Sequence, residues 1–71
     1  MKSEENIAFG ANLAQIRNNL GITQEELAFR CGFDRSYIGT IERGEKSATI
    51  NTLSKIAKGL NLKIKDLFDY E

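Results

Sequence analysis

The chain of 71 residues contains no histidine and a single cysteine, Cys31. One cysteine cannot form an internal disulfide, and one thiol without any histidine argues against a zinc site. Histidine is also the commonest general base near neutral pH, so its absence argues against an enzyme. The sequence has no glycine-rich loop that could hold a phosphate, and no carboxylate pair placed around an obvious pocket. We therefore expect no enzymatic activity, no cofactor and no metal.

Long apolar runs are also missing, since none approaches the length that spans a membrane. The first six residues are polar and acidic, unlike a signal peptide. We expect a soluble, cytoplasmic protein whose thiol stays reduced. A domain this small buries only about 60% of the surface that its unfolded chain exposes. Such domains usually gain stability from a disulfide, a metal or a partner subunit, and self-association is the option that remains.

Neither sign of charge dominates, because ten Lys and Arg balance ten Asp and Glu. This balance alone argues against a nucleic-acid partner, but the distribution of the charges favours one. Residues 35–65 hold seven Lys or Arg against two Glu, whereas residues 1–34 and 66–71 are both net acidic. Contact with phosphates requires a basic face rather than a basic total. Charge by itself leaves open that these lysines simply lie on solvated helix faces.

Apolar residues at spacings of three and four predict an all-α, compact five-helix domain that spans residues 1–71. On the first helix, Phe9, Leu13 and Leu20 fall on one inward face. Thr23 and Glu26 form a capping box at the start of the second. Four helices begin at a residue that can cap them and end at Gly or Asn. These boundaries are Ser3 and Gly21, Thr23 and Gly32, Asp34 and Gly44, and Thr49 and Asn61, with a fifth short helix over 64–68.

The second and third helices have the spacing of a helix-turn-helix over about residues 23–43. Ala28 is small enough for two helices to cross there, and Gly32 opens the turn four residues later. Ile38 follows after six more residues and anchors the second of the two helices. In this motif the second helix enters the major groove of DNA. The remaining inward positions are filled by Leu27, Cys31, Phe33 and Ile41.

The same residues resemble a known family. The sequence is similar to the phage-repressor and Cro type of helix-turn-helix, the xenobiotic-response-element family. The residues that carry this similarity are 23–28 (TQEELA), Gly32, Tyr37-Ile38 and 41–44 (IERG). The resemblance continues through residues 53–60 and 66–68. Within the family, residues 34–38 and 41–44 look most like the controller proteins of restriction-modification systems. The resemblance implies a transcription regulator, which as a controller would act on its own gene and a neighbouring endonuclease gene. It would activate at low dose and repress at high dose.

The face of the third helix opposite Ile38 and Ile41 is predicted to read DNA bases. Arg35 lies near the end of the helix that points into the groove, and arginine can bond guanine O6 and N7 together. The alternative is an exposed arginine paired with Asp34 or with a phosphate. A glycine inside a helix costs about 1 kcal/mol of stability relative to alanine. Gly39 is explained either by close approach of this helix to DNA or by plain tolerance of a glycine at that position. The predicted base-reading residues are Arg35, Ser36, Gly39 and Thr40.

Phosphate contacts are predicted on either side of this helix. The resemblance implies that Gln24 bonds a phosphate, which the positive end of its helix would support; the alternative is a local contact at the helix start. The resemblance also implies a partly buried, structural ion pair between Arg17 and Glu42. The predicted phosphate-binding residues are Gln24, Tyr37, Arg43 and Lys46.

Because one recognition helix reads only a few base pairs, we expect a homodimer on a pseudo-palindromic double-stranded DNA operator. RNA polymerase is a further expected partner, since a dimer near a promoter can block or aid it. The dimerisation region is about residues 50–70, where apolar residues exceed what so short a segment can hide, although some complete the monomer core. The predicted dimer surface is Leu60, Leu62, Ile64, Leu67, Phe68 and Tyr70.

Two alternatives remain open. The first, in the same class, is a phage-type repressor or an antitoxin-like regulator. The second is a protein-interaction module that uses the helix-turn-helix scaffold without DNA. That module would have a third helix whose outward face is poor in arginine and hydrogen-bonding groups. The outward face predicted here has two arginines and two hydroxyl side chains, which argues against such a module. These residues are Arg35, Ser36, Thr40 and Arg43.

Overall fold

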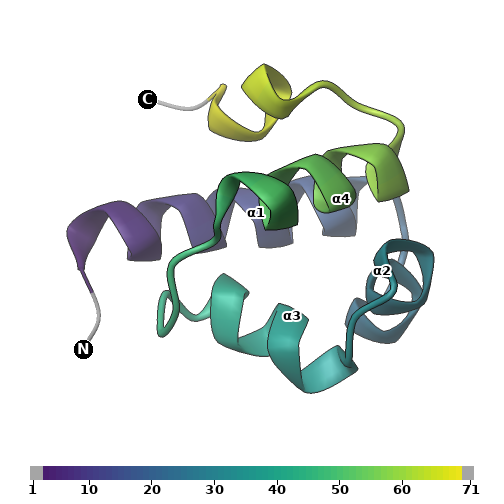
Figure 1. Cartoon of the computed structure of the whole chain (residues 1–71), viewed down its shortest axis with the longest axis horizontal. Coiled ribbons are helices and arrows are strands. Elements are labelled where there is room, and N and C mark those ends of the chain that lie inside the picture. Colours follow the sequence, from purple (N-terminus) through teal and green to yellow (C-terminus); the bar gives the residue numbers. More distant parts are fainter. Residues whose placement is uncertain (1–2, 70–71) are drawn as a thin grey trace.

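The computed structural model describes residues 3–69, and every regular element within this range is a helix (Figure 1). The α-helices are α1 (Glu4–Asn19), α2 (Gln24–Cys31), α3 (Arg35–Glu42) and α4 (Ile50–Leu60). The fifth element, η1 (Ile64–Phe68), is a 3₁₀ helix, so the prediction of five α-helices is wrong at the last one. A segment of five residues is too short for a stable α-helix and takes the tighter 3₁₀ pattern, which suits short pieces.

Side-chain caps begin three of the four α-helices as predicted. The hydroxyls of Ser3, Thr23 and Thr49 each accept a hydrogen bond from the amide three residues later. Asp34 is the N-cap residue of α3 as predicted, but its side chain makes no capping hydrogen bond. The capping box of α2 is half formed, because the Glu26 carboxylate accepts from Arg30 Nε at 3.0 Å.

One hydrophobic core joins all five elements. Leu20, predicted on the inward face of α1, is 52% exposed because it lies at the C-cap, where the chain turns away from the core. Cys31 is buried, and this burial raises the pKa of its thiol, an effect that nearby Arg30 opposes. The largest side chains that are fully enclosed are Leu13, Leu27, Ile38, Ile41, Ile56 and Leu67.

Close backbone approach at Gly10 sets the position of α3 against α1. A Cβ atom at Gly10 would overlap the backbone carbonyl oxygens of Ile41 and Glu42. Only glycine therefore lets α1 touch the end of α3, and this contact brings Arg17 on α1 within reach of Glu42. α2 packs against both α3 and α4, which holds the two helices of the motif as one unit.

α3 and η1 lie on opposite sides of the molecule. In Figure 1, α3 (teal) is at the bottom and η1 (yellow-green) at the top, next to the C-terminal end of the described chain. η1 is held by packing against α1 and α4 and by a hydrogen bond from Asn12 Nδ2 to the Leu67 carbonyl at 2.8 Å. Among the described residues, no helix is long and apolar enough to cross a membrane.

Candidate nucleic-acid interface

The first turn of α3 offers exposed polar side chains. Arg35 and Ser36 are both exposed, and Arg35 forms no hydrogen bond or ion pair with any residue in the described range. The alternative pairing of Arg35 with Asp34 is therefore not seen. Thr40, one turn further along, is half-buried and donates its hydroxyl to the Tyr37 carbonyl at 2.7 Å. Arg35 is thus the cation of α3 whose donors are all available to a ligand.

Gly39 does not lie open on this face as predicted, because it is buried. The side chain of Arg43 folds back along α3 and covers it. A Cβ atom at Gly39 would lie 3.0 Å from Arg43 Nη1 and 3.7 Å from Gln24 Oε1. Long helical side chains usually point toward the preceding turn, so the missing side chain at residue 39 leaves the space that Arg43 fills.

A chain of polar contacts links α1, α2 and α3 beneath this face. Arg17 Nε and Nη2 donate to the two carboxylate oxygens of Glu42 at 2.7 and 3.1 Å, and Arg17 Nη1 donates to the Ile22 carbonyl at 2.8 Å. Gln24 Nε2 donates to Glu42 Oε1 at 2.8 Å. Glu42 therefore holds Arg17 and Gln24 at once, which fixes the direction in which the Gln24 amide points.

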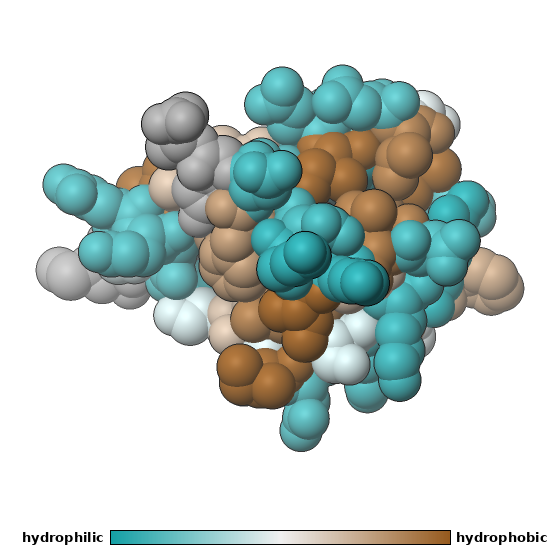
Figure 2. All heavy atoms as spheres, turned by 90° about the horizontal axis from the view of Figure 1, so that it is seen from above, coloured by the Kyte–Doolittle hydropathy of each residue, from teal (hydrophilic) through white to brown (hydrophobic). Residues whose placement is uncertain are grey.

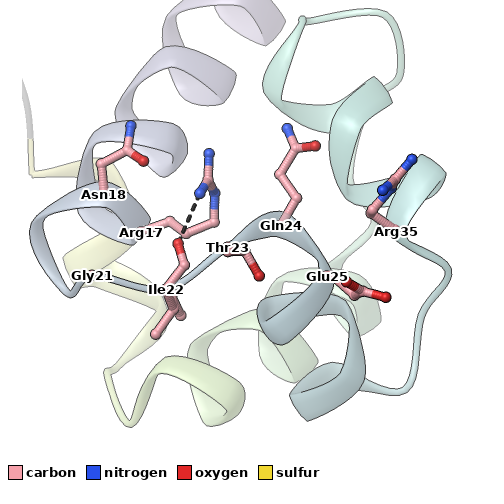
Figure 3. A pocket seen from close by; sticks show the side chains of 8 residues that line it. All are labelled: Arg17, Asn18, Gly21, Ile22, Thr23, Gln24, Glu25 and Arg35. Atoms are coloured by element: carbon pink, nitrogen blue, oxygen red, sulfur yellow. Dashed lines mark hydrogen bonds between the residues drawn. The ribbon is translucent and has the colours of Figure 1, made fainter.

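A shallow hollow of about 570 Å³ lies between the end of α1, the start of α2 and the start of α3. Figure 3 shows the side chains of Asn18, Arg17, Gln24 and Arg35 pointing to the same side of it. The hollow is lined by two cations, two amides, the Glu25 carboxylate and the N-terminal end of α2, where the helix dipole favours an anion. The lining residues are Arg17, Asn18, Gly21, Ile22, Thr23, Gln24, Glu25 and Arg35.

Tyr37 in the first turn of α3 and Lys46 in the loop after α3 lie together, near the start of α4. The Tyr37 hydroxyl is 3.3 Å from Thr52 Oγ1 near the start of α4, and Lys46 Nζ lies 5.9 Å from the centre of the Tyr37 ring. Thr52 is buried, so its hydroxyl helps to fix the tyrosine. The two predicted phosphate contacts, Tyr37 and Lys46, are therefore neighbours, while Gln24 belongs to the hollow beside α2.

Arg43 is engaged by a carboxylate of the loop that follows α3. Its Nε and Nη2 donate to Glu45 Oε2 and Oε1 at 2.9 and 3.2 Å. The hydrogen bonds to Glu45 and the charge of Glu45 raise the pKa of Arg43 further above its ordinary value. Arg43 is therefore charged and already paired in the free protein.

The predicted dimer surface divides into core and exposed residues. Leu60 and Leu67 are buried and fill the monomer core, which is the alternative left open for this segment. Leu62 is half-buried against the same core. Ile64 and Phe68 remain 37% and 46% exposed. Tyr70 lies outside the described residues.

Ile64 and Phe68 place exposed apolar side chains on the side of η1. Figure 2 views this side, and apolar side chains (brown) lie in its middle among charged ones (teal). The Phe68 ring packs on Phe9 with centroids 5.0 Å apart. Both rings border a hollow of about 280 Å³, which also includes Ala48 and Leu53. This side of the molecule therefore offers a shallow apolar surface away from α3.

Sequence reasoning missed three polar residues of the interface, namely Asn18, Glu45 and Thr52. Thr52 could have been found, because Thr49 and Thr52 have the spacing of a helix start. Asn18 and Glu45 lie outside the motif's two helices, and no sequence pattern marks them.

Comparison with known proteins agrees with this geometry. A model of the helix-turn-helix family matches residues 13–67. The control protein C.BamHI of Bacillus amyloliquefaciens is 38% identical over 71 residues, which is 99% of this chain and 88% of that protein.

Solved structures of controller proteins have the same fold. The restriction-modification controller protein C.AhdI from Aeromonas hydrophila matches with a TM-score of 0.90 and 36% identity, covering 93% of this chain and 100% of that chain. The C.Esp1396I controller tetramer, solved in complex with its natural 35 base-pair operator, matches with a TM-score of 0.86 and 35% identity. That match covers 96% of this chain and 90% of the other. The resemblance stated from the residues alone is confirmed.

Proposed function

This chain belongs to the helix-turn-helix family, and from that premise we propose that it is a sequence-specific DNA-binding regulator of transcription, namely the controller of a restriction-modification system. The observation that carries the proposal is the exposed Arg35 at the start of α3, free of any described partner, beside a hollow lined by Gln24 and Arg17. Its similarity to C.BamHI and C.AhdI supports the narrower assignment. The proposed mechanism is occupancy of an operator, without catalysis.

The residues divide into two roles. Arg35 reads a base, because its guanidinium is free to make the two parallel hydrogen bonds that guanine accepts. Ser36 and Thr40 contact the same groove, and Gly39 lets the covering side chains lie close to α3. Gln24 at the start of α2, together with Tyr37 on α3 and Lys46 in the loop after it, holds the phosphates and so positions α3.

A homodimer is the proposed functional unit. Two copies related by a two-fold axis would place two recognition helices about one turn of DNA apart. Such a dimer near a promoter would block RNA polymerase at one position and assist it at another. As a controller it would act on its own gene and on a neighbouring endonuclease gene.

Selection from random DNA duplexes with the purified protein tests the function. We expect enrichment of a two-fold symmetric motif, because both half-sites meet the same side chains. If no sequence is enriched at low salt, the scaffold serves protein interaction instead. A motif without symmetry would remove the dimer from the proposal while leaving DNA binding intact.

The exposed residues of η1 are the proposed dimer contacts. Phe68→Ser should raise the dissociation constant of the dimer by at least about tenfold. The reason is that an aromatic anchor buried in an interface contributes more than about 1 kcal/mol and is lost in both copies. Sedimentation measures the dimer fraction against concentration. Phe29→Ser is the matched control, since Phe29 is 83% exposed but lies on α2. Equal dimer fractions for the two variants would place the interface elsewhere.

A further inference from the structure

We propose that Glu45 is an internal competitor of DNA, whose carboxylate occupies in the free protein the guanidinium of Arg43 that a phosphate takes in the complex. The inference rests on the proposed function, because it assumes that the face beside α3 meets DNA. It also gives Arg43 a specific task within the phosphate-binding set. Glu45 thereby sets how tightly the protein holds any duplex.

The geometry of the pair matches that of a phosphate contact. Arg43 Nε and Nη2 meet the two carboxylate oxygens of Glu45 at 2.9 and 3.2 Å. Arginine binds both carboxylates and phosphates in this way, with two parallel N–H groups that donate to two oxygen atoms. A phosphate can therefore replace the carboxylate without any change in the donor atoms.

The position of Arg43 places this exchange on the DNA-facing side. Arg43 Nη1 and Gln24 Oε1 both lie within 4 Å of the point where a Cβ of Gly39 would stand, at 3.0 and 3.7 Å. The guanidinium is thus a neighbour of the Gln24 amide at the start of α2. Gln24 Nε2 donates to Glu42, so the amide oxygen of Gln24 is the atom that faces the Arg43 guanidinium. Arg43 therefore lies beside the start of α2, and its guanidinium is the donor there that a phosphate would meet.

Exposure makes the exchange reversible. The Arg43 and Glu45 side chains are 56% and 40% exposed, so solvent and ligand reach both. Exposed ion pairs are weak, because water screens them, and a phosphate can displace such a carboxylate. The cost of displacement is the same for every DNA sequence, since phosphates carry no sequence information. Glu45 therefore changes affinity and salt dependence without changing which bases are preferred.

Glu45→Gln tests this inference on the full-length protein. We expect the variant to bind the selected operator and a random duplex of equal length about two- to fivefold more tightly, the factor for one exposed ion pair. The slope of log affinity against log salt should steepen by less than about 0.9 for each protomer, because Arg43 neutralises the same phosphate in both complexes and only the competing ion pair is lost. Fluorescence anisotropy titrations over a series of salt concentrations measure both quantities.

Glu26→Gln is the matched control. It removes the same charge from a similar exposed pair, in which Arg30 Nε lies 3.0 Å from Glu26 Oε2 on α2. Its effect should be clearly smaller, since it reports only the change in net charge. In an Arg43→Gln background, Glu45→Gln should then have no effect beyond that of Glu26→Gln.

Two results would overturn the inference alone. If Glu45→Gln and Glu26→Gln change the DNA affinity equally, Glu45 acts only through the net charge of the protein and does not compete with a phosphate. Weaker DNA binding by Glu45→Gln would show that Glu45 orients Arg43 within the complex. A wild-type protein that binds no duplex would instead overturn the proposed function, and that result is visible before any variant is compared.

Discussion

Arg17→Met should lower the free energy of unfolding by about 3–5 kcal/mol, because it leaves a buried carboxylate without its cation. The Arg17 and Glu42 side chains are only 12% and 5% exposed. Arg17 also supplies the hydrogen bond to the Ile22 carbonyl that holds the turn between α1 and α2. Urea denaturation followed by circular dichroism measures the loss.

Arg30→Met is the control for this prediction, since it breaks the exposed pair with Glu26, whose side chains are 42% and 48% exposed. That loss should stay below about 1 kcal/mol. The double variant Arg17→Met/Glu42→Leu should recover most of the stability, because no buried charge is left unpaired. It should nevertheless bind DNA more weakly, because Gln24 loses the acceptor that directs its amide. Similar losses for Arg17→Met and Arg30→Met would mean that the buried pair contributes little.

Arg35→Ala should cost about 1–3 kcal/mol of binding free energy on the selected operator and relax the preference at one base-pair position in each half-site. Arg35 is exposed and has no described partner, so the fold does not depend on it. The free energy of unfolding of the Arg35→Ala variant should therefore differ from that of the wild type by no more than about 0.5 kcal/mol. Repeating the duplex selection with the variant shows which position loses its preference.

Lys46→Ala provides the contrast with a phosphate contact. It should weaken binding to all duplexes alike and reduce the salt slope by about one per protomer, with the selected motif unchanged. If Arg35→Ala behaves in the same uniform way, Arg35 binds a phosphate and another side chain of α3 reads the base.

The sequence predicts the helix-turn-helix because its signals are local or regularly spaced. Thr23 at the start of α2 and Gly32 at its end act within one or two turns of helix, and the structure has both, with Gly32 at a φ of 79°. The spacing from Ala28 to Ile38 specifies which sides of α2 and α3 meet, and both residues are buried. These features depend on neighbours in the chain, so no knowledge of the other helices is needed.

Tertiary packing decided which apolar residues of the C-terminal segment stay exposed. Helical spacing makes Leu60, Leu67 and Phe68 equally suited to a core or an interface. In the structure, Leu60 and Leu67 are enclosed while Phe68 is left half open against Phe9. An apolar periodicity marks a face of a helix, but what covers that face depends on elements far away in the chain.

The same distinction holds for the charged residues. From the sequence alone, the residue types on the outward face of α3 determined that this surface is polar and basic enough for DNA. Only the tertiary structure decided which of these charges are free: Arg43 is paired with Glu45, whereas Arg35 has no partner among the described residues. The physical reason is that long side chains have many rotamers, and close contacts such as that of Gly10 with the end of α3 select among them.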